Sequence, residues 1–457
     1  MKIHKILASE VACLDSNVYS GGGTDDTKAL QAVLDMAKDG DGVWLVMDGA
    51  SLVSQLKLYS NTTIECLSKD CGFFQIEQTN ASIVTNAIWD DYELKTKNIS
   101  LIGGTYNQDC KRQEHHTEDD RCWFVEGKGY EPSKKKYTIG VEFYGIENLK
   151  ISGITLRNFR SFACTIGCFR NVIIENSWLD LPDHEDSMNQ DGFHFWGPGS
   201  FLTVKNVGGR VGDDFMNLGP DERDKVSSIT DVLVDGVFLE NADQAIRLLS
   251  RDKGRLDRVT IRNVTGTYKS FGFYINPWFV DDTLGNFGNI FIENVDLKAL
   301  EPNYKHRTPI LFSVGGNIEA LVLKNIRNHD SIDNRTLIEI GIPYIVPFQN
   351  KYLKEYGVEQ NMENIIIEDL LVTEKEVDPK DTEYITVHEK VKNLVVRNAK
   401  VFKDQDENGA LLSIKDNGCI ETLVVEDVYM KGLKTFINDE EKIGKLTLSN
   451  VTKEEQK

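Results

Sequence analysis

The sequence lacks the features that would mark a membrane-spanning, disulfide-stapled or nucleic-acid-binding protein. No apolar run approaches the roughly 18 residues that cross a bilayer, and the eight cysteines include no CxxC pair. Basic residues are in deficit, since 52 Lys and Arg stand against 72 Asp and Glu and the net charge is −20. That charge repels phosphate backbones and anionic lipid surfaces. We therefore expect neither a nucleic-acid partner nor a membrane partner.

A convincing export signal is also missing from residues 1–17. This segment has two lysines, but Glu10 interrupts its short apolar stretch. A cytoplasmic protein is therefore predicted, or a secreted one only if a leader is absent from this sequence. In a reducing compartment the cysteines are expected to be free thiols, mostly buried. Hydrophobic residues make up 40% of the 457 residues, which is enough for a large core and too many for a disordered chain.

What the sequence does contain is a seven-residue phrase that recurs along most of the chain. It reads polar, apolar, any, apolar, polar, then Asn, Asp or Gly, then apolar, as in NVIIENS from Asn171 and NIFIENV from Asn289. Most starts are separated by 22 to 31 residues. The alternation and the abundance of Val and Ile predict a strand, and the Asn or Gly predicts a turn. One short strand per period cannot bury its apolar face alone, so successive periods must stack.

These repeats predict an all-β, single-domain parallel β-helix over residues 1–457. Leucine-rich and helical solenoids are disfavoured because their Leu-rich or Ala-rich signatures are absent and no amphipathic helix separates the phrases. Residues 105–147 and 327–363 are longer intervals and are predicted to be loop insertions. Residues 452–457 are predicted to be a frayed tail.

Residues 24–40 are predicted to form a helix that caps the N-terminal end of the solenoid, where apolar faces would otherwise be exposed. Thr24 or Asp25 is the expected N-cap, and Gly40 is expected to end the helix. An apolar stripe at helical spacing would face the first coil, and it consists of Leu30, Val33, Leu34 and Ala37.

Alignment of neighbouring periods brings acidic residues together. The segment DGFHFWGP from Asp191 matches DDFMNLGP from Asp213 and DQAIRLLS from Asp243. This register predicts one column of Asp191, Asp213 and Asp243, with Asp214 beside Asp213. A second column on the same face is expected to contain Phe195, Asn217 and Arg247. Residues expected to face the core are Met216, Leu218, Ile246 and Leu248.

Stacked aspartates repel one another, so their presence calls for an explanation. One interpretation is a solvated Asp ladder or a set of turn-forming side chains. The other is acid–base cleavage of a glycosidic bond, in which one carboxylic acid protonates the leaving oxygen and another carboxylate activates water. Crowding of like charges is a physical way to raise the pKa of one member above the others.

The motifs NQDG (189–192) and GDD (212–214) resemble the NTD and DD motifs of glycoside hydrolase family 28, the polygalacturonase-like enzymes of the pectin-lyase-like β-helix superfamily. The segment GGGTDDTKALQAVLDMA (21–37) also resembles the opening of many pectinase-type β-helix proteins. The resemblance implies a right-handed β-helix and hydrolysis by single displacement with inversion. It implies that Asp213 is the general acid and that Asp191 and Asp214 activate the attacking water.

The sequence departs from that family at two motifs. Gln244-Ala245-Ile246 stands where the family has GHG. Arg247-Leu248-Leu249 matches the arginine of the family's RIK motif but lacks its lysine. Galacturonate specificity therefore does not follow from the resemblance. His194 alternates with Gly192 and Trp196, which favours a hydrogen-bonded core histidine, with support of the site as the alternative. The predicted substrate-binding residues are Asn189, His194, Asn217, Gln244, Arg247, Tyr274 and Trp278.

A local basic cluster near the predicted site could receive a substrate carboxylate or sulfate, or could simply balance charge on a solvated turn. It consists of Arg247, Arg251, Lys253, Arg255 and Arg258. No metal site and no cofactor are predicted.

The sequence thus predicts a glycoside hydrolase that cleaves a plant- or microbe-derived poly- or oligosaccharide. A β-helix polysaccharide lyase or epimerase and a non-catalytic carbohydrate-binding solenoid are the alternatives. The sugar, the linkage, endo or exo action and the oligomeric state are left open.

Overall fold

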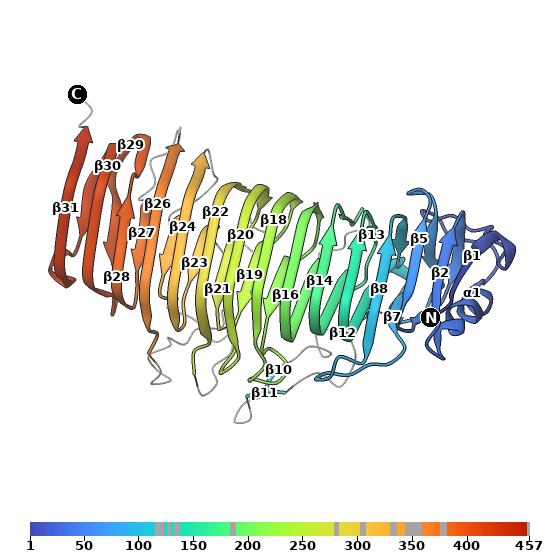
Figure 1. Cartoon of the computed structure of the whole chain (residues 1–457). Coiled ribbons are helices and arrows are strands. Elements are labelled where there is room, and N and C mark those ends of the chain that lie inside the picture. Colours follow the sequence, from blue (N-terminus) through green and yellow to red (C-terminus); the bar gives the residue numbers. More distant parts are fainter. Residues whose placement is uncertain are drawn as a thin grey trace. The chain divides into compact units, whose positions relative to one another are not determined.

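The computed structural model describes residues 1–114, 123–125, 129–131, 138–182, 189–277, 283–301, 308–329, 336–342, 359–374 and 382–454. The chain divides into two compact units, Met1–Met216 (unit 1) and Asn217–Lys457 (unit 2), and each is described by itself. Strands dominate both units, and α1 (Thr27–Leu34) is the one α-helix among the described residues (Figure 1).

Unit 1 contains three ladders of parallel strands, one on each side of the coil. The first ladder runs through β1 (Ile3–Leu7), β2 (Gly42–Met47), β5 (Thr62–Cys66), β8 (Thr96–Ile102), β12 (Val141–Ser152), β14 (Cys164–Glu175) and β16 (Phe193–Arg210). The second runs through β3 (Ala50–Val53), β6 (Gly72–Gln75), β9 (Thr105–Asn107), β13 (Thr155–Arg157), β15 (Trp178–Asp180) and the end of β16. The third joins β4 (Leu56–Leu58) and β7 (Val84–Asn86) to the first residues of β12, β14 and β16.

Unit 2 repeats the same plan with longer strands. One ladder runs through β18 (Ile229–Asn241), β20 (Arg255–Tyr268), β22 (Asn286–Ala299), β24 (Ile318–His329), β26 (Met362–Glu374), β28 (Lys390–Arg397), β30 (Cys419–Asn438) and β31 (Ile443–Glu454). Another runs through β19 (Gln244–Leu249), β21 (Phe271–Asn276), β23 (Ile310–Val314), β25 (Ile338–Ile340), β27 (Glu383–Val387) and β29 (Lys400–Ile414). The strand β17 (Asp214–Gly219) begins in unit 1 and ends in unit 2.

The apolar positions of the phrase form the core because they stack in register from coil to coil. In unit 1 one inward column consists of Leu45, Ile64, Leu101, Ile151, Ile174 and Val204, all fully buried. The equivalent column in unit 2 includes Val234, Ile261, Ile292, Leu323 and Ile367. Burial of each such side chain contributes roughly 1.5–3 kcal/mol. This repeated stacking is what the short strands need to be stable.

The sixth residue of the phrase turns the chain, as predicted. It has a positive φ in every phrase except the first, for example 68° at Gly153, 52° at Asn176 and 56° at Asn294. Asn and Gly tolerate this left-handed conformation better than other residues. Many of these asparagines also bond along the solenoid, and Asn325 Nδ2 donates to Asn294 Oδ1 at 2.7 Å. The turn residue therefore bends the chain, and where it is asparagine it can also hydrogen-bond to the neighbouring coil.

The N-terminal helix is present but shorter than the predicted 24–40. It begins at Thr27 and ends at Leu34, and the short 3-10 helix η2 (Asp35–Ala37) follows. Asp26 is the N-cap residue, although the Asp25 carboxylate is the group that accepts the Thr27 N–H, at 2.9 Å. The predicted apolar stripe is confirmed, because Leu30, Val33, Leu34 and Ala37 are all buried.

Asp26 anchors this cap rather than serving any exposed function. Only 2% of Asp26 is exposed, and its carboxylate accepts the backbone N–H groups of Cys13 and Leu14 and the Ser51 hydroxyl. A buried carboxylate is tolerated when hydrogen bonds replace its hydration. The opening motif TDDT therefore acts structurally.

Three predicted loop or tail boundaries need correction. The interval 327–363 is not one loop, because β25 (Ile338–Ile340) forms a rung between β23 and β27. It was missed because a three-residue strand without the full phrase gives too weak an alternation. The interval 105–147 begins with β9, continues through η3 (Cys110–Arg112), and includes the antiparallel pair β10 (Trp123–Val125) and β11 (Gly129–Glu131). Within the predicted tail, residues 452–454 extend β31 and pair with Tyr429–Lys431.

The fold class is the predicted one, an all-β parallel β-helix with an N-terminal capping helix. Crossovers between parallel strands are right-handed in about 98% of cases, which agrees with the expected winding. Two further 3-10 helices are η1 (Ala8–Glu10) and η6 (Glu440–Lys442). In the described part of the chain, every helix is too short or too polar to cross a membrane.

Among the described cysteines, Cys13, Cys66, Cys71, Cys164, Cys168 and Cys419 are free thiols. Five described cysteines are buried, namely Cys66, Cys71, Cys110, Cys164 and Cys168, which agrees with the prediction that most are buried. Burial raises the pKa of Cys164 to about 12 and that of Cys168 to about 11. Thiols with such high pKa values are poor nucleophiles at neutral pH.

Candidate active site

The register between β14 and β16 decides which way the DGFHFWG segment faces. Cys164 pairs with Phe193 and Ile166 pairs with Phe195, and all four side chains are buried in the core. Thr165 pairs with His194, so His194 and Trp196 lie on the opposite, outer face. The expectation that Phe195 belongs to an outward column was therefore wrong. His194 is buried and hydrogen-bonded, as predicted, but its side chain lies on the outer face of the strand rather than in the core of the coil. The apolar residues of this segment sit one position away from where the alignment placed them.

The two acidic segments are linked by backbone hydrogen bonds between neighbouring coils. The Gly192 N–H donates to the Asp214 carbonyl at 2.8 Å, just as the Ala163 N–H donates to the Asp191 carbonyl one coil earlier. These equivalent bonds place Asp214, rather than Asp213, opposite Asp191. The predicted column is thus shifted by one residue. Adjacent coils are separated by about 4.8 Å, so the acidic residues of both segments still belong to neighbouring rungs.

Asp213 is held next to the first acidic motif. Its Oδ2 accepts the Asn189 N–H at 3.0 Å, and its own N–H points to the Gln190 carbonyl at 3.3 Å. Asp213 is half-buried, whereas Asp191 and Asp214 are each only 4% exposed. The backbone segments that carry the three aspartates are therefore hydrogen-bonded neighbours within unit 1, and Asp213 is the most exposed of the three residues.

Gly192 is the residue that allows the two segments to lie this close. A Cβ atom at this position would lie 2.3 Å from the Phe215 carbonyl oxygen and 2.5 Å from a Leu179 side-chain carbon. The next rung is therefore in direct contact with the glycine backbone. The ring of Phe193 packs edge-on against Phe215 beside it, with centroids 6.1 Å apart. This contact fixes where the second motif begins.

His194 forms a buried pair with Asp191. Its Nδ1 lies 2.9 Å from Asp191 Oδ2, and the two side chains are 2% and 5% exposed. A carboxylate at Nδ1 fixes the orientation of the imidazole and favours the tautomer with a proton on that nitrogen. The supporting role that was the alternative for His194 is the one that this geometry favours.

An aromatic cluster around His194 was not predicted. Phe162 stacks on the imidazole with centroids 4.5 Å apart, and Trp196 lies 4.9 Å from it. Tyr144 stacks in turn on Trp89 at 3.8 Å. The alternation in FHFWG and the pairing of Tyr144, Gly167 and Trp196 across three strands were the available signals. These rings exclude water from the Asp191–His194 pair, which strengthens its electrostatic interaction.

Two of the candidates in unit 2, Arg247 and Tyr274, contact each other. The Arg247 guanidinium lies 5.0 Å from the centroid of the Tyr274 ring, and its NH2 is 3.5 Å from Asn276 Oδ1. Tyr274 also stacks on Phe271 at 4.2 Å. Asn217, Gln244, Arg247 and Tyr274 are at most 7% exposed. Trp278 lies outside the described residues, so its predicted role remains a prediction.

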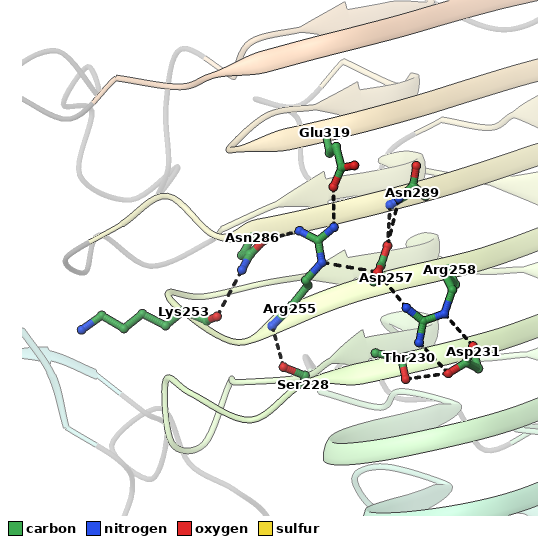
Figure 2. Close-up of polar contacts among 10 residues, drawn as sticks. All are labelled: Ser228, Thr230, Asp231, Lys253, Arg255, Asp257, Arg258, Asn286, Asn289 and Glu319. Carbon is green, nitrogen blue, oxygen red and sulfur yellow. Dashed lines mark hydrogen bonds and ion pairs between the residues drawn. The ribbon is translucent and has the colours of Figure 1, made fainter.

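Most of the predicted basic cluster is engaged in a structural network (Figure 2). Arg258 donates to both oxygens of Asp231, at 2.7 and 2.8 Å, and to Asp257 at 3.0 Å. Arg255 contacts Asp257, Glu319 and Asn286. Lys253 joins through its backbone carbonyl, and its ammonium group points away from the other residues drawn. This network favours the charge-balance interpretation for Arg255 and Arg258.

Two further observations concern possible metal groups and hollows in the described part of the chain. Among the residues that the structure describes, no group of His, Cys, Asp and Glu could hold a metal ion. A shallow hollow of about 480 Å³ lies in unit 1 along Trp44, Thr63, Ser100 and Lys150. It is not lined by Asp191, Asp213 or Asp214. The aspartate site is therefore distinct from this hollow.

Solved structures share the fold at low sequence identity. The N-terminal fragment of bacteriophage phi29 gene product 12 is 12% identical with a TM-score of 0.52, and the likeness covers 98% of this chain and 66% of that one. A family 28 exopolygalacturonase from Yersinia enterocolitica is 13% identical with a TM-score of 0.44, over 98% and 78% of the two chains. The A-module of the mannuronan C-5 epimerase AlgE6 from Azotobacter vinelandii is 10% identical with a TM-score of 0.48, over 99% and 100%.

No protein-family model matches the chain, and no curated protein matches it. At these identities the likeness extends to the parallel β-helix fold alone. The parallel β-helix that the motif resemblance implied is the fold that the strand ladders of this chain form.

Proposed function

We propose that the protein is a glycoside hydrolase that cleaves a poly- or oligosaccharide at the Asp191, Asp213 and Asp214 site. The observation that carries the proposal is the linkage of the NQDG and GDD segments, in which Asn189 bonds to Asp213 and Gly192 bonds to Asp214. Three carboxylates on neighbouring rungs are costly unless a function uses them. Hydrolysis of a glycosidic bond needs such a set of acid and base groups.

In this mechanism Asp213 is the general acid, because it is the most accessible of the three aspartates. It protonates the glycosidic oxygen as the bond to the anomeric carbon breaks. Asp191 and Asp214 accept the proton of the water that attacks that carbon. His194 is a positioning residue that orients Asp191 through the 2.9 Å contact. Attack on the face opposite the leaving group inverts the anomeric configuration, as the resemblance to family 28 implies.

Asn189 is the proposed substrate-binding residue beside these aspartates, and substrate binding by Asn217, Gln244, Arg247 and Tyr274 of unit 2 remains a prediction from the sequence. Arg247 is the cation among them, and a planar guanidinium suits a sugar carboxylate or a ring hydroxyl. The family's GHG motif is missing, so the proposal does not specify galacturonate. A neutral sugar is as compatible with the present residues as a uronate.

The experiment is a glycan-library digestion that compares the wild type with Asp213→Asn. We expect kcat of the variant to fall by about 10²–10⁴-fold, because the amide cannot donate the catalytic proton. The anomeric form of the first product, followed by NMR, should be inverted relative to the substrate. Asp41→Asn, which alters a surface carboxylate paired with His4, should leave the rate unchanged.

Other outcomes would identify the competing functions. A product that absorbs in the ultraviolet, or a rate abolished by a chelator, would indicate a lyase, and a changed sugar without chain cleavage would indicate an epimerase. Binding of a glycan by both proteins with no turnover would indicate a carbohydrate-binding solenoid. Any of these three results contradicts the proposed hydrolysis.

A further inference from the structure

A column of polar side chains runs along the outer face of unit 2. The strand registers pair Arg247 with Tyr274, Tyr274 with Ser313, Ser313 with Glu339, and Glu339 with Thr386. These residues occupy successive rungs of one ladder, about 4.8 Å apart. A core-forming sequence does not need a carboxylate and two hydroxyls at these positions. The column therefore calls for a ligand or a structural explanation.

Near the centre of the column, Ser313 and Glu339 lie close to two further residues, His388 and Asp416. Ser313 Oγ donates to Glu339 Oε2 at 2.8 Å. His388 Nδ1 lies 2.8 Å from Asp416 Oδ2, and its Nε2 lies 3.9 Å from Glu339 Oε1. That last distance is too long for a hydrogen bond. Asp416 thus fixes the ring so that Nε2 faces Glu339 across a gap that a hydroxyl group can bridge.

The Thr386 hydroxyl supplies an independent sign of a ligand. Thr386 is 2% exposed, and its Oγ1 has no hydrogen-bond partner in the structure. A buried hydroxyl without a partner is rare, because the loss of its hydration is not compensated. Thr386 is the register neighbour of Glu339, and His388 follows it two residues later, just beyond the end of β27. Its hydroxyl therefore belongs to the same group.

The group is accessible from one side. Asp416 is 58% exposed, whereas Glu339 and His388 keep 17% and 16% of their side-chain surface exposed. Glu339 and Asp416 give the group two carboxylates against one imidazole, and the adjacent Lys415 is already paired with Glu383. This balance repels an anionic ligand. It suits a neutral ligand with several hydroxyl groups, which donate to carboxylates and exchange hydrogen bonds with Thr386 and Ser313.

We propose that Ser313, Glu339, Thr386 and His388 form a binding site for a neutral oligosaccharide, separate from the hydrolytic aspartates. Glu339 accepts hydrogen bonds from sugar hydroxyls, and Thr386 both donates and accepts one. His388 Nε2 takes part in the hydroxyl contact that spans the gap to Glu339. Uronic-acid oligosaccharides are disfavoured here by the two carboxylates.

The test is a binding titration in the Asp213→Asn background, in which hydrolysis does not consume the probe. Maltopentaose, cellopentaose, mannopentaose and pentagalacturonic acid are titrated by calorimetry. We expect at least one neutral pentasaccharide to bind more tightly than the uronate. Thr386→Val should weaken that binding by about tenfold, the size of one hydrogen bond between uncharged groups. Thr386→Ser, which keeps the hydroxyl, should bind within about threefold of the parent.

Folding and site assignment are checked separately. Thr386→Val removes a hydroxyl that has no partner, so its thermal midpoint should equal or exceed that of the parent. The imidazole ¹⁵N signals of His388 should shift on addition of the sugar, and this shift should vanish in Glu339→Gln. The proposal is overturned if none of the neutral probes binds, or if Thr386→Val binds as tightly as the parent. Turnover by Asp213→Asn at the wild-type rate would instead contradict the proposed hydrolysis, and binding by the Thr386 variants could still be compared.

Discussion

At the scale of single residues, the closest fit in the candidate active site is at Gly192. Its backbone touches the next rung at the Phe215 carbonyl, so the position has no room for a side chain. The same glycine donates the hydrogen bond that places Asp214 opposite Asp191. Both the stability of the fold and the geometry of the site thus require that residue 192 has no Cβ atom.

We predict that Gly192→Ala destabilises the protein by about 2 kcal/mol or more, because a Cβ must push two rungs of backbone apart. The variant should also lose most of its activity, since Asp214 moves with the second rung. Urea unfolding measures the first effect and initial rates the second. Gly42→Ala is the control, because its nearest contact is the flexible Ile3 side chain at 3.3 Å. Equal stability of the two variants would contradict the close-contact interpretation.

At the scale of the elements, charged side chains link the first residues of β18, β20 and β24. Arg258 connects Asp231 to Asp257, and Arg255 reaches Glu319 further along unit 2 (Figure 2). The Arg258 side chain holds the pKa of Asp231 at about 2, below its ordinary 3.8. A carboxylate with a lowered pKa stabilises the fold above the pKa of its unfolded form. That contribution is lost as the pH falls through the folded value.

We predict that Asp231→Asn lowers stability by about 1 kcal/mol at pH 7, a value reduced by solvent screening of a partly exposed pair. The difference between variant and wild type should shrink as the pH falls from about 4 to 2. Urea unfolding at pH 7, 4 and 2.5 measures it. Lys253→Ala changes a cation just before β20 whose ammonium group points away from the network (Figure 2), and it should show no such pH dependence. A difference that grows on acidification would contradict the ion-pair interpretation.

At the scale of the whole molecule, each rung is stabilised by its neighbours, as in other solenoids. β20 pairs with β18 on one side and β22 on the other. β31 pairs with β30, and most of its residues are exposed, including Leu448 at 48%. Local opening should therefore be easier at β31 than in the middle of unit 2.

We predict that the backbone amides of β31 exchange with deuterium roughly 100-fold faster than those of β20 under native conditions. Peptide-resolved mass spectrometry over a time course measures both segments in one sample. The apolar column supports the difference, because Val234, Ile261 and Ile292 are fully buried. Uniform protection of both strands would show instead that unit 2 opens as a single cooperative body.

The outcome at particular residues shows where sequence reasoning succeeded. The sixth residue of the phrase was predicted to turn, and Gly153, Asn176 and Asn294 do so. Local conformational preference determines such positions. The facing of His194 and Phe195 was predicted wrongly, because a shift of one residue exchanges the two faces of a strand. β25 was missed, since three residues carry too little alternation.

The repeating phrase by itself determined the parallel β-helix, because short amphipathic strands separated by regular turns bury their apolar faces by stacking on the equivalent strands of neighbouring coils. The sequence also identified the acidic residues on which the proposed hydrolysis depends. Only the tertiary structure decided the partners: Asp191 with His194, Asp214 with Gly192, and Glu339 with Ser313 and Thr386. These contacts join residues of different coils or depend on strand facing, and the register that brings them together is set by packing across rungs rather than by local sequence.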